Sequence, residues 1–461
     1  MFAKRIAVIG GGISGLAAVH RLVELGVPSS QITLIEGSGR LGGTLETRHR
    51  DGFLLERGPD SFISEKPEAV ALAKRLGLES RLIETNDQYR RSFIVRDGRL
   101  RAVPEGFQLL APSRVWPFIT TDIFSLTGKL RMAAELLLPR ENGKQDESLA
   151  SFVRRRLGRE ALERMAQPMV GGIYTADPET LSLRATLPRF LEMERKHRSL
   201  ILAMMRQGQK AGTSGARYSL FLSFDRGMEV LVDVLAEVVP NVRLNTLVEE
   251  LSFDSRTWRI NTESGESFEA DAVCLAVPAY TAGKLLDNVN PQLASRLNAI
   301  KYASTATINF AYPRAAIGHP LNGFGFVVPF IEKRSLIACT FSNVKFAGRA
   351  PEDHVLLRAF AGGALQPDVF ALDESTLVAR IEADLRELLK IDRKPLFTEV
   401  AKWGRSMPQY EVGHLDRVQA IENEAGGLRG LALAGNAYRG AGIPDCIRSG
   451  ERAAESLVRE A

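Results

Sequence analysis

Six residues near the start of the chain, Gly10-Gly11-Gly12-Ile13-Ser14-Gly15, have the types and the spacing of a turn that holds phosphate groups. In such a turn the first glycine allows a tight bend, Gly12 lets the backbone approach a pyrophosphate, and Gly15 lets a helix pack against a strand. A helix that follows would direct the positive end of its dipole at the phosphates. The chemistry predicted here is the binding of a dinucleotide.

The elements that must position this turn can be recognised around it. Residues 6–9 are apolar and predict a buried strand, residues 16–25 predict a helix, and residues 32–35 predict a second strand that ends on Glu36. Glu36 is placed to accept hydrogen bonds from a ribose hydroxyl. A glycine-rich surface loop would not need an acid after a second apolar strand. The unit therefore predicts a nucleotide site, although by itself it fits NAD as well as FAD.

The four residues Arg40-Leu41-Gly42-Gly43 extend this unit. They resemble the extension found in the large flavoprotein superfamily of amine oxidases, phytoene desaturases and protoporphyrinogen oxidases. The resemblance implies that the cofactor is FAD.

Composition sets the broad class of the protein. A chain of 461 residues is long for one simple core, so we expect two or three connected domains. Hydrophobic content of 45% and charged content of 25% are ordinary for a soluble globular protein. No apolar run approaches the ~20 residues that a membrane-spanning helix needs, and a strand follows Met1 without space for a signal peptide. We expect a cytoplasmic protein.

Cysteine and histidine give no sign of a metal centre. Cys274, Cys339 and Cys446 lie far apart, which predicts free buried thiols and no zinc site or disulfide framework. The six histidines are scattered and form no nucleophile or metal motif. Redox chemistry carried by a cofactor is the remaining expectation.

The net charge of +5 and the pI near 9.1 suit an anionic substrate or an anionic membrane surface. Arginines cluster near residues 90–101, 154–156 and 195–198, although a solvated helix face is the more ordinary explanation for any one cluster. No motif supports nucleic-acid binding.

The rest of the chain predicts a mixed α/β fold. Asp97-Gly98 predicts a hairpin between residues 93 and 103, and residues 148–165 and 187–205 have helical periodicity. Residues 171–178 predict a loop because they are rich in glycine and end on proline. Residues 115–138 are apolar and fit either buried core or a membrane-surface patch, and residues 210–217 predict a flexible join.

Strands are also predicted at residues 242–244, 248–253, 258–262 and 272–276, in the layout of a flavin domain that resumes after an excursion. A second lobe follows, with strands at 306–310, 324–328, 336–341 and 355–361 and a helix over 375–389. Near the end, residues 430–434 predict a strand that leads through a glycine turn into a helix over 447–458. The free amides of that helix could contact the flavin ring or the pyrophosphate.

Nearly the whole chain resembles one branch of this superfamily, the oxygen-dependent protoporphyrinogen and coproporphyrinogen III oxidases of haem synthesis. The stretches that carry the resemblance are Glu56–Phe62, Phe124–Arg131, Gly172–Asp177, Leu181–Leu183 and Tyr438–Ile447. Amine oxidases share the two ends of the chain but not this middle.

The resemblance implies a Rossmann-like FAD-binding domain built from residues 1–64, 218–278 and 404–461. Residues 65–89 and 279–403 would form a sheet-containing substrate domain. Residues 90–217 would form a helical domain, and whether it associates with a membrane is left open.

The resemblance also implies which residues form the sites. FAD contacts are expected at Gly10, Gly11, Gly12, Ile13, Ser14, Gly15, Glu36, Arg40, Gly43, Thr44, Gly58, Pro59, Asp60, Ser61, Val248, Trp403, Gly442, Ile443 and Pro444. The backbone carbonyl of Gly172 is expected to face the reacting methylene bridge of the substrate. The expected cavity residues are Arg91, Ser92, Phe324, Val327, Thr340 and Phe360. Ordinary core packing is the alternative for the last four.

Ser92 is a departure from part of the family. Members that act on protoporphyrinogen often carry an arginine there that pairs with a substrate propionate, whereas enzymes of the Gram-positive coproporphyrinogen type do not. Arg90, Arg91 or Arg96 could substitute for it. Coproporphyrinogen has four carboxylates, which suits the many arginines of the chain.

The expected reaction is a six-electron aromatisation of a porphyrinogen in three rounds. Each round moves a hydride from a bridge carbon to flavin N5 and a proton from a pyrrole nitrogen, and O2 then reoxidises the flavin with release of H2O2. No catalytic acid or base is required, since the protein mainly orients a flat substrate and excludes water. The partners expected are the porphyrinogen, O2, a membrane surface and a ferrochelatase that receives the product. Monomer and homodimer are both open.

Two rival functions remain open from the sequence. The first is a related FAD-dependent amine oxidase or carotenoid desaturase. The second is a non-catalytic, FAD-bound module that binds a membrane or a partner protein.

Overall fold

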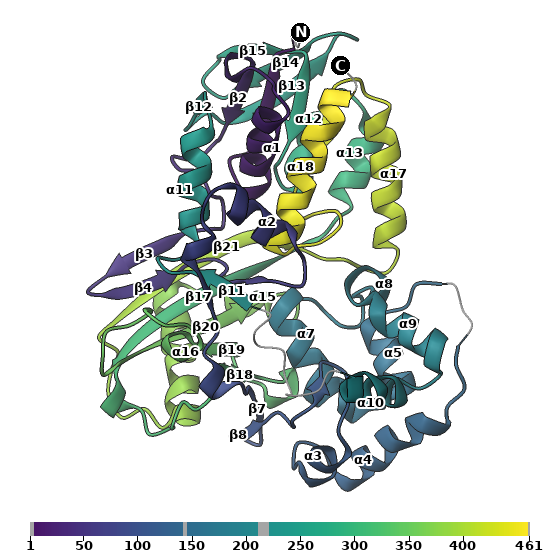
Figure 1. Ribbon diagram of the computed structural model, residues 1–461, viewed down its shortest axis with the longest axis vertical. Helices are drawn as coiled ribbons and strands as arrows, with labels where there is room; N and C mark the ends of the chain where they lie inside the picture. The colour runs from purple at the N-terminus through teal and green to yellow at the C-terminus, as the bar shows by residue number, and fades with distance from the viewer. Residues whose placement is uncertain (1–3, 142–144, 211–220, 460–461) are drawn as a thin grey trace.

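The computed structural model describes residues 4–141, 145–210 and 221–459 (Figure 1). A parallel sheet and the helices around it occupy one end of the molecule. A larger, mainly antiparallel sheet and a group of helices lie side by side at the other end. This is the mixed α/β architecture predicted from the sequence.

The parallel sheet has five strands in the order β12-β2-β1-β16-β22. Their bounds are β1 (Ile6–Ile9), β2 (Ile32–Ile35), β12 (Val242–Arg243), β16 (Ala272–Leu275) and β22 (Leu431–Leu433). Both faces are covered, which is why β1 and β16 are short runs of entirely buried apolar residues. Because the strands come from three distant parts of the chain, the prediction of a nucleotide-binding unit built from discontinuous segments is confirmed.

Two helices cross one face of this sheet in contact with each other, α1 (Ile13–Glu24) and α18 (Ile443–Arg459). A Cβ built on Gly450 would lie 2.1 Å from the carbonyl oxygen of Ser14, so only glycine permits this approach. Further along, Arg21 pairs with Glu455 at 2.8 Å. The helices therefore run parallel, and their N-termini lie at the same end of the sheet.

The larger sheet has seven strands in the order β21-β17-β20-β19-β18-β7-β8. Their bounds are β7 (Phe93–Arg96), β8 (Arg99–Ala102), β17 (Tyr302–Pro313), β18 (Gly325–Val327), β19 (Leu336–Phe341), β20 (His354–Gly362) and β21 (Phe397–Pro408). Every neighbouring pair is antiparallel except β7 with β18. Helix α16 (Glu374–Leu389) buries Leu377, Ile381 and Leu385 against one face. The other face is turned toward the helical region and the 56–61 segment.

The helical region has its own apolar core. Its elements are α3 (Val115–Thr120), α4 (Leu126–Ala133), η4 (Ala134–Leu137), α5 (Leu149–Arg156), α6 (Arg159–Ala161), η5 (Leu162–Ala166), α7 (Gln167–Tyr174), α8 (Leu183–Thr186), α9 (Pro188–His197) and α10 (Leu200–Lys210). Among the described residues no helix combines the length and the apolarity needed to cross a bilayer.

The remaining strands and helices pack around the sheets or connect these parts. The strands are β3 (Thr47–Arg50), β4 (Phe53–Glu56), β5 (Phe62–Ile63), β6 (Leu82–Glu84), β9 (Phe107–Gln108), β10 (Ala111–Pro112), β11 (Phe221–Phe224), β13 (Val248–Phe253), β14 (Trp258–Thr262) and β15 (Ser267–Ala270). The helices are α2 (Glu68–Arg75), α11 (Glu229–Val238), α12 (Ala279–Leu286), α13 (Pro291–Asn298), α14 (Ser342–Lys345), α15 (Pro367–Ala371) and α17 (His414–Gly426).

Several predictions of local structure were wrong. The loop predicted over 171–178 is helical as far as Tyr174, because Gly171 and Gly172 continue the helix that starts at Gln167. The helix predicted over 148–165 is interrupted at Gly158, where φ is +96°. The helix predicted over 187–205 is interrupted at Arg198, where φ is +63°. The predicted flexible join at 210–217 lies, beyond Lys210, outside the described residues.

Candidate flavin and substrate site

The phosphate turn connects β1 to α1, and its glycines differ in what surrounds them. Gly10 has φ +109°, and a Cβ on it would lie 2.4 Å from the carbonyl oxygen of Ala276. A Cβ on Gly15 would lie 1.9 Å from the carbonyl oxygen of Gly10. A Cβ on Gly12 would meet no described atom within 4 Å. Gly10 and Gly15 are therefore required by the fold, whereas Gly12 leaves the backbone open to a ligand.

The loop that follows β2 lies directly against this turn. The amide of Gly42 donates to the carbonyl of Gly11 at 2.9 Å, and Gly12 and Gly42 form an isolated bridge. The Arg40 guanidinium donates to the carbonyls of Leu41 at 2.8 Å and Leu45 at 3.1 Å, and also to that of Gly43. Arg40 thus holds the shape of its own loop, and the structure brings together the two glycine motifs of the sequence.

Glu36 closes the far side of the turn. Its Oε2 accepts the amide of Gly11 at 2.7 Å and its Oε1 accepts the amide of Ser38 at 2.8 Å. Each carboxylate oxygen has a second lone pair that can accept a ribose hydroxyl. Val248 opens β13 close by, since its neighbour Leu247 lies 3.1 Å from a Cβ built on Gly37.

The 58–61 segment continues the lining on the other side of the loop. A Cβ on Gly58 would lie 1.6 Å from the carbonyl oxygen of Thr44. The indole Nε1 of Trp403 donates to the carbonyl of Arg57 at 2.9 Å. Asp60 belongs to this segment and is paired with Lys345 at 3.0 Å. Burial alone would raise the pKa of Asp60, but the charges of Lys345 and Arg358 outweigh it and hold that pKa below its usual range.

The N-terminus of α18 faces the same space. Ile443 and Pro444 begin the helix, and the amide of Cys446 donates to the carbonyl of Gly442 at 2.9 Å. Asp445 is buried in the first turn, where Lys66 at 2.5 Å and Arg448 pair with it. The positive dipole ends of α1 and α18 converge on one region, which suits a pyrophosphate and the polar edge of a ring. The open backbone at Gly12, this pair of helix ends and the acid at Glu36 fit a bound dinucleotide.

Three of the predicted cavity residues share one face of the seven-stranded sheet. Val327 lies opposite Ala338, Ala338 lies opposite Phe360, and Thr340 lies opposite Arg358. Directly opposed residues of antiparallel strands point to the same face. Val327, Thr340 and Phe360 are each only half-buried, so this face is open enough to receive a ligand.

Gly172 meets this face from the last turn of α7. A Cβ on Gly172 would lie 3.8 Å from Cγ1 of Val327, and Gly172 itself is exposed. Carbonyl groups in the last turn of a helix have no donor within the helix, so the Gly172 carbonyl is available to a ligand. The five-residue π-helical segment η5 precedes α7, and such irregular turns often accompany functional sites.

Arg91, Ser92 and Phe324 lie at the edge of this region. The amide of Phe324 donates to the carbonyl of Arg91 at 2.8 Å, and the amide of Val103 donates to that of Ser92 at 2.9 Å. Arg91 is exposed and Phe324 is buried. Arg91 is therefore accessible to a ligand, whereas Phe324 is packed inside the protein.

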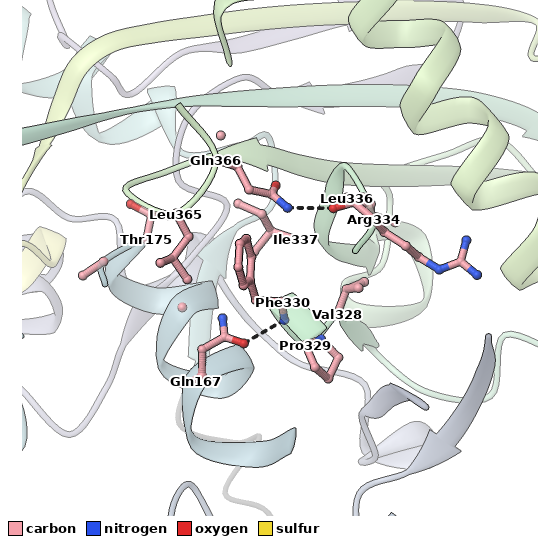
Figure 2. A pocket seen from close by; sticks show the side chains of 13 residues that line it. Gln167, Thr175, Val328, Pro329, Phe330, Arg334, Leu336, Ile337, Leu365 and Gln366 are labelled. Atoms are coloured by element: carbon pink, nitrogen blue, oxygen red, sulfur yellow. Dashed lines mark hydrogen bonds between the residues drawn. The ribbon is translucent and has the colours of Figure 1, made fainter. Parts of the chain in front are cut away.

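Figure 2 shows a small cavity between α7 and the turn that follows β18, lined among others by Gln167, Thr175 and Phe330. Gln167 accepts the amide of Phe330 at 2.8 Å, and Gln366 donates to the carbonyl of Arg334 at 2.6 Å. The cavity volume of about 20 Å³ has room for a water molecule and not for a macrocycle. It is therefore not the substrate site.

The described part of the chain includes all three cysteines and shows how its possible metal ligands are arranged. Cys274, Cys339 and Cys446 are free and buried, as predicted, and burial raises the pKa of Cys274 and of Cys446 to about 12. Within the described residues no group of three His, Cys, Asp or Glu side chains is arranged to hold a metal ion.

Sequence reasoning missed four charged residues beside the 58–61 segment, the buried Glu56, Arg349 and Arg358 and the half-buried Lys345. Arg358 carried a signal that could have been used, because it is a charged residue in the middle of the apolar stretch 355–361. Nothing local to Lys345 or Arg349 separates them from surface residues.

Comparison with known proteins identifies the family. The family described as flavin containing amine oxidoreductase matches residues 13–458. The chain belongs to this family. FAD is accordingly its cofactor.

Relatives of the chain include named porphyrinogen oxidases. The coproporphyrinogen III oxidase of Bacillus subtilis (strain 168) is 34% identical over 99% of this chain and 98% of its own length. The chloroplastic protoporphyrinogen oxidase of Nicotiana tabacum is 29% identical over 98% of this chain and 85% of its own. A solved structure from Exiguobacterium sp. 255-15, provisionally named protoporphyrinogen oxidase, superposes with a TM-score of 0.89 at 32% identity and covers both chains completely.

Proposed function

We propose that this flavoenzyme aromatises a porphyrinogen to a porphyrin in haem biosynthesis, with coproporphyrinogen III as the preferred substrate and O2 as the electron acceptor. The observation that carries the proposal is the full-length similarity to the Bacillus coproporphyrinogen III oxidase. Ser92 supports the choice of substrate, since a propionate-pairing arginine is absent from this position. Basic side chains near the entrance, Arg91 among them, suit the four carboxylates of coproporphyrinogen.

The geometry suits a flat, apolar substrate held against a ring. Gly172, Val327, Thr340 and Phe360 would form one wall of the cavity, with the Gly172 carbonyl toward a methylene bridge and the pyrrole N–H groups. When bound, FAD would accept a hydride from a bridge carbon in each of three rounds and would then reduce O2 to H2O2. The protein's own contribution is orientation and exclusion of water. This explains why the wall contains no acid or base.

The three parts of the fold would then have separate tasks. We assign FAD binding to residues 1–64, 218–278 and 404–461, substrate binding to 65–89 and 279–403, and a helical domain to 90–217. Hairpin β7–β8 joins the substrate sheet although it lies in the third of these stretches. We also propose that the FAD contacts expected from the sequence, of which Gly10 is the first and Pro444 the last, bind the cofactor.

We also propose that the helical domain docks on an anionic membrane surface. Six large side chains of α3, α4 and η4 are more than half exposed, and we call them the apolar patch: Val115, Trp116, Ile119, Leu126, Leu130 and Leu137. Arg114, Lys129, Arg131 and Arg140 accompany the patch, together with the exposed acids Glu105, Asp122 and Glu141, of which Glu105 pairs with Arg114 at 3.1 Å. Apolar anchors flanked by basic residues are typical of peripheral binding to anionic lipid.

The test of the activity is direct. The FAD-loaded protein is incubated in air with coproporphyrinogen III or with protoporphyrinogen IX, and porphyrin fluorescence is followed. We expect porphyrin from both or from the first alone, with the larger kcat/KM for coproporphyrinogen III. No porphyrin from either substrate while the flavin stays bound would refute the function. H2O2 production from a panel of amines would then point to an amine oxidase.

A further inference from the structure

Five charged side chains lie together where the seven-stranded sheet meets the 56–61 segment. Glu56 and Asp60 come from that segment, and Lys345, Arg349 and Arg358 come from α14, the following loop and β20. We call these five residues the charge cluster. Glu56 is 3% exposed, Arg349 2% and Arg358 4%, so most of the cluster is cut off from water.

Two cations of the cluster converge on Asp60. The Lys345 ammonium lies 3.1 and 3.0 Å from the two carboxylate oxygens of Asp60 and 3.1 Å from the hydroxyl of Ser61. Arg358 Nη1 lies 3.6 Å from Asp60 Oδ2, and its Nη2 donates to the carbonyl of Gly58. Asp60 is therefore shared by two positive charges.

No carboxylate of the described residues forms a hydrogen bond with the third cation. Arg349 Nη2 donates to the Ser223 hydroxyl at 2.8 Å and to the Phe224 carbonyl at 2.9 Å. Its Nη1 donates to the backbone carbonyl of Asp225, whose side chain pairs with Arg81 at 3.0 Å nearer the surface. Arg349 thus adds a buried positive charge.

Glu56 offsets this charge incompletely. It accepts the Thr47 hydroxyl and the Met228 amide, each at 2.8 Å, and burial raises its pKa to about 7. Three cations against two carboxylates leave an excess of one positive charge, and of two when Glu56 is protonated.

Neighbouring charges do not cancel this excess. Arg40, Arg48 and Arg57 lie nearby but are matched by three carboxylates of their own, those of Glu46, Glu229 and Glu399. Within the described residues the Nε of Arg358 is buried without a hydrogen-bond partner. Buried positive charge that protein carboxylates leave uncompensated is costly, and a bound negative charge would offset it.

The position of the charge cluster indicates what that negative charge is. Gly58, to which Arg358 donates, packs against Thr44, and Gly43 packs against Gly12 in the phosphate turn. On the other side Arg358 shares a sheet face with Thr340 and lies 4.6 Å from the centroid of the Phe360 ring. The charge cluster therefore adjoins both the FAD lining and the substrate wall.

We propose that the charge cluster stabilises the negative charge that the flavin acquires on reduction. The inference rests on the proposed FAD site. A hydride brings two electrons and one proton to a neutral oxidised flavin, so the reduced ring carries one extra negative charge. Lys345 and Arg358 favour that anion through space, and Asp60 holds the two cations in place and moderates their charge.

Sulfite binding tests this without turnover. Sulfite adds to an oxidised flavin, bleaches its visible band and leaves negative charge on the ring, so its Kd reports the local potential. In FAD-loaded Lys345→Met we expect the sulfite Kd to rise about tenfold, the order expected for loss of one nearby unit charge. Lys345→Arg should restore it. Lys301→Met, at an exposed lysine paired with Glu411, is the matched control and should leave the Kd unchanged.

The variant Asp60→Asn should change the sulfite Kd in the opposite direction and so decides between a charge effect and structural damage. It removes a negative charge with little change of shape, so we expect the sulfite Kd to fall and the flavin midpoint potential to rise, opposite to Lys345→Met. Structural damage would shift both variants in the same direction. Equal shifts in the two variants, or no shift in either, would overturn the inference. A charge dependence of this kind in a protein that forms no porphyrin would refute only the proposed substrate.

Discussion

At the scale of single residues, the glycines of the phosphate turn have two different roles. Some are needed for the fold, and others are needed for ligand binding. A Cβ at position 15 would overlap the carbonyl of Gly10, whereas a Cβ at position 12 would enter open space. Gly15 therefore belongs to the packing of α1 on β1, and Gly12 to the surface that a pyrophosphate approaches.

Alanine at these two positions should have different effects. In the FAD-free protein we expect Gly12→Ala to change the free energy of unfolding by less than about 0.5 kcal/mol, and Gly15→Ala to lower it by about 1–3 kcal/mol through overpacking. Gly12→Ala should instead weaken FAD binding about tenfold or more. Urea denaturation and fluorescence titration with FAD measure the two quantities. Equal destabilisation by both variants would contradict the assignment.

Glu56 makes stability depend on pH near neutrality. Burial raises its pKa from 4.5 to about 7, so the folded protein holds this proton more tightly than the unfolded chain does. The proton on Glu56 therefore stabilises the folded state. This stabilisation is fully present at low pH and is lost as the pH rises through about 7. Linkage puts its size at about 3 kcal/mol.

Substitution by glutamine should remove this dependence. Between about pH 5 and pH 8 we expect the free energy of unfolding to fall by about 3 kcal/mol more in the wild type than in Glu56→Gln, since every other group titrates alike in both. Denaturant unfolding at the two pH values measures the difference. Parallel profiles would show that Glu56 keeps an ordinary pKa.

At the scale of elements, a buried arginine organises the helical region. Arg156, at the end of α5, is fully buried and pairs with Glu135 of η4 and, at 3.4 Å, with Glu194 of α9. It also donates to the carbonyls of Pro139 at 2.8 Å and Arg198 at 2.6 Å. One side chain thus joins three separate pieces of backbone.

Loss of this arginine should be costly because the buried carboxylate of Glu135 would lose its cationic partner, whereas Glu194 would keep Arg155 at 2.6 Å. We expect Arg156→Met to lower the free energy of unfolding by about 3–5 kcal/mol. The control on the same helix is Arg154→Met, whose exposed pair with Glu179 is worth about 1 kcal/mol or less. Chemical denaturation of both variants tests this. Similar small losses would mean that Arg156 adds little to the fold.

Some helices and strands could be predicted from the sequence and others could not. The phosphate turn, β1, β2 and the β7–β8 hairpin were predicted because their signals are local: glycine spacing, short apolar runs and Asp97-Gly98. Strand β21 was missed because Lys402, Gly404, Arg405 and Ser406 hide its alternation at the edge of the sheet. The second half of α7, from Gly171 to Tyr174, was predicted as a loop because the two glycines lower helix propensity, and tertiary packing overrides that preference.

Some site residues could likewise be predicted from local sequence, whereas others depend on how distant elements pack together. Gly10 to Gly15 and Glu36 could be predicted from spacing alone. The meeting of Gly172 with Val327 could not, because it depends on how α7 packs against the sheet. The charge cluster could not either, since its five residues are brought together only by the pairing of β4, β19 and β20 with their neighbours.

At the scale of the whole molecule, the apolar patch lies on the helical region, at the opposite end from the nucleotide sheet (Figure 1). Phe118, Ile123, Phe124 and Met132 of the same segment are buried, so the segment serves as core on one side and leaves apolar side chains exposed on the other. Membrane docking there would leave the dinucleotide end in water and hold the substrate face close to lipid-soluble partners.

Vesicle binding tests this orientation. We expect the protein to sediment with vesicles that contain phosphatidylglycerol and less with pure phosphatidylcholine, because basic residues accompany the patch. Trp116 and Leu137 are 74% and 82% exposed, so Trp116→Gln/Leu137→Gln should preserve folding and weaken vesicle binding about tenfold or more through lost apolar burial. The control is Leu396→Gln, at a leucine 54% exposed outside the patch, which should bind as the wild type does. Undiminished binding by the double variant would place the membrane contact elsewhere on the molecule.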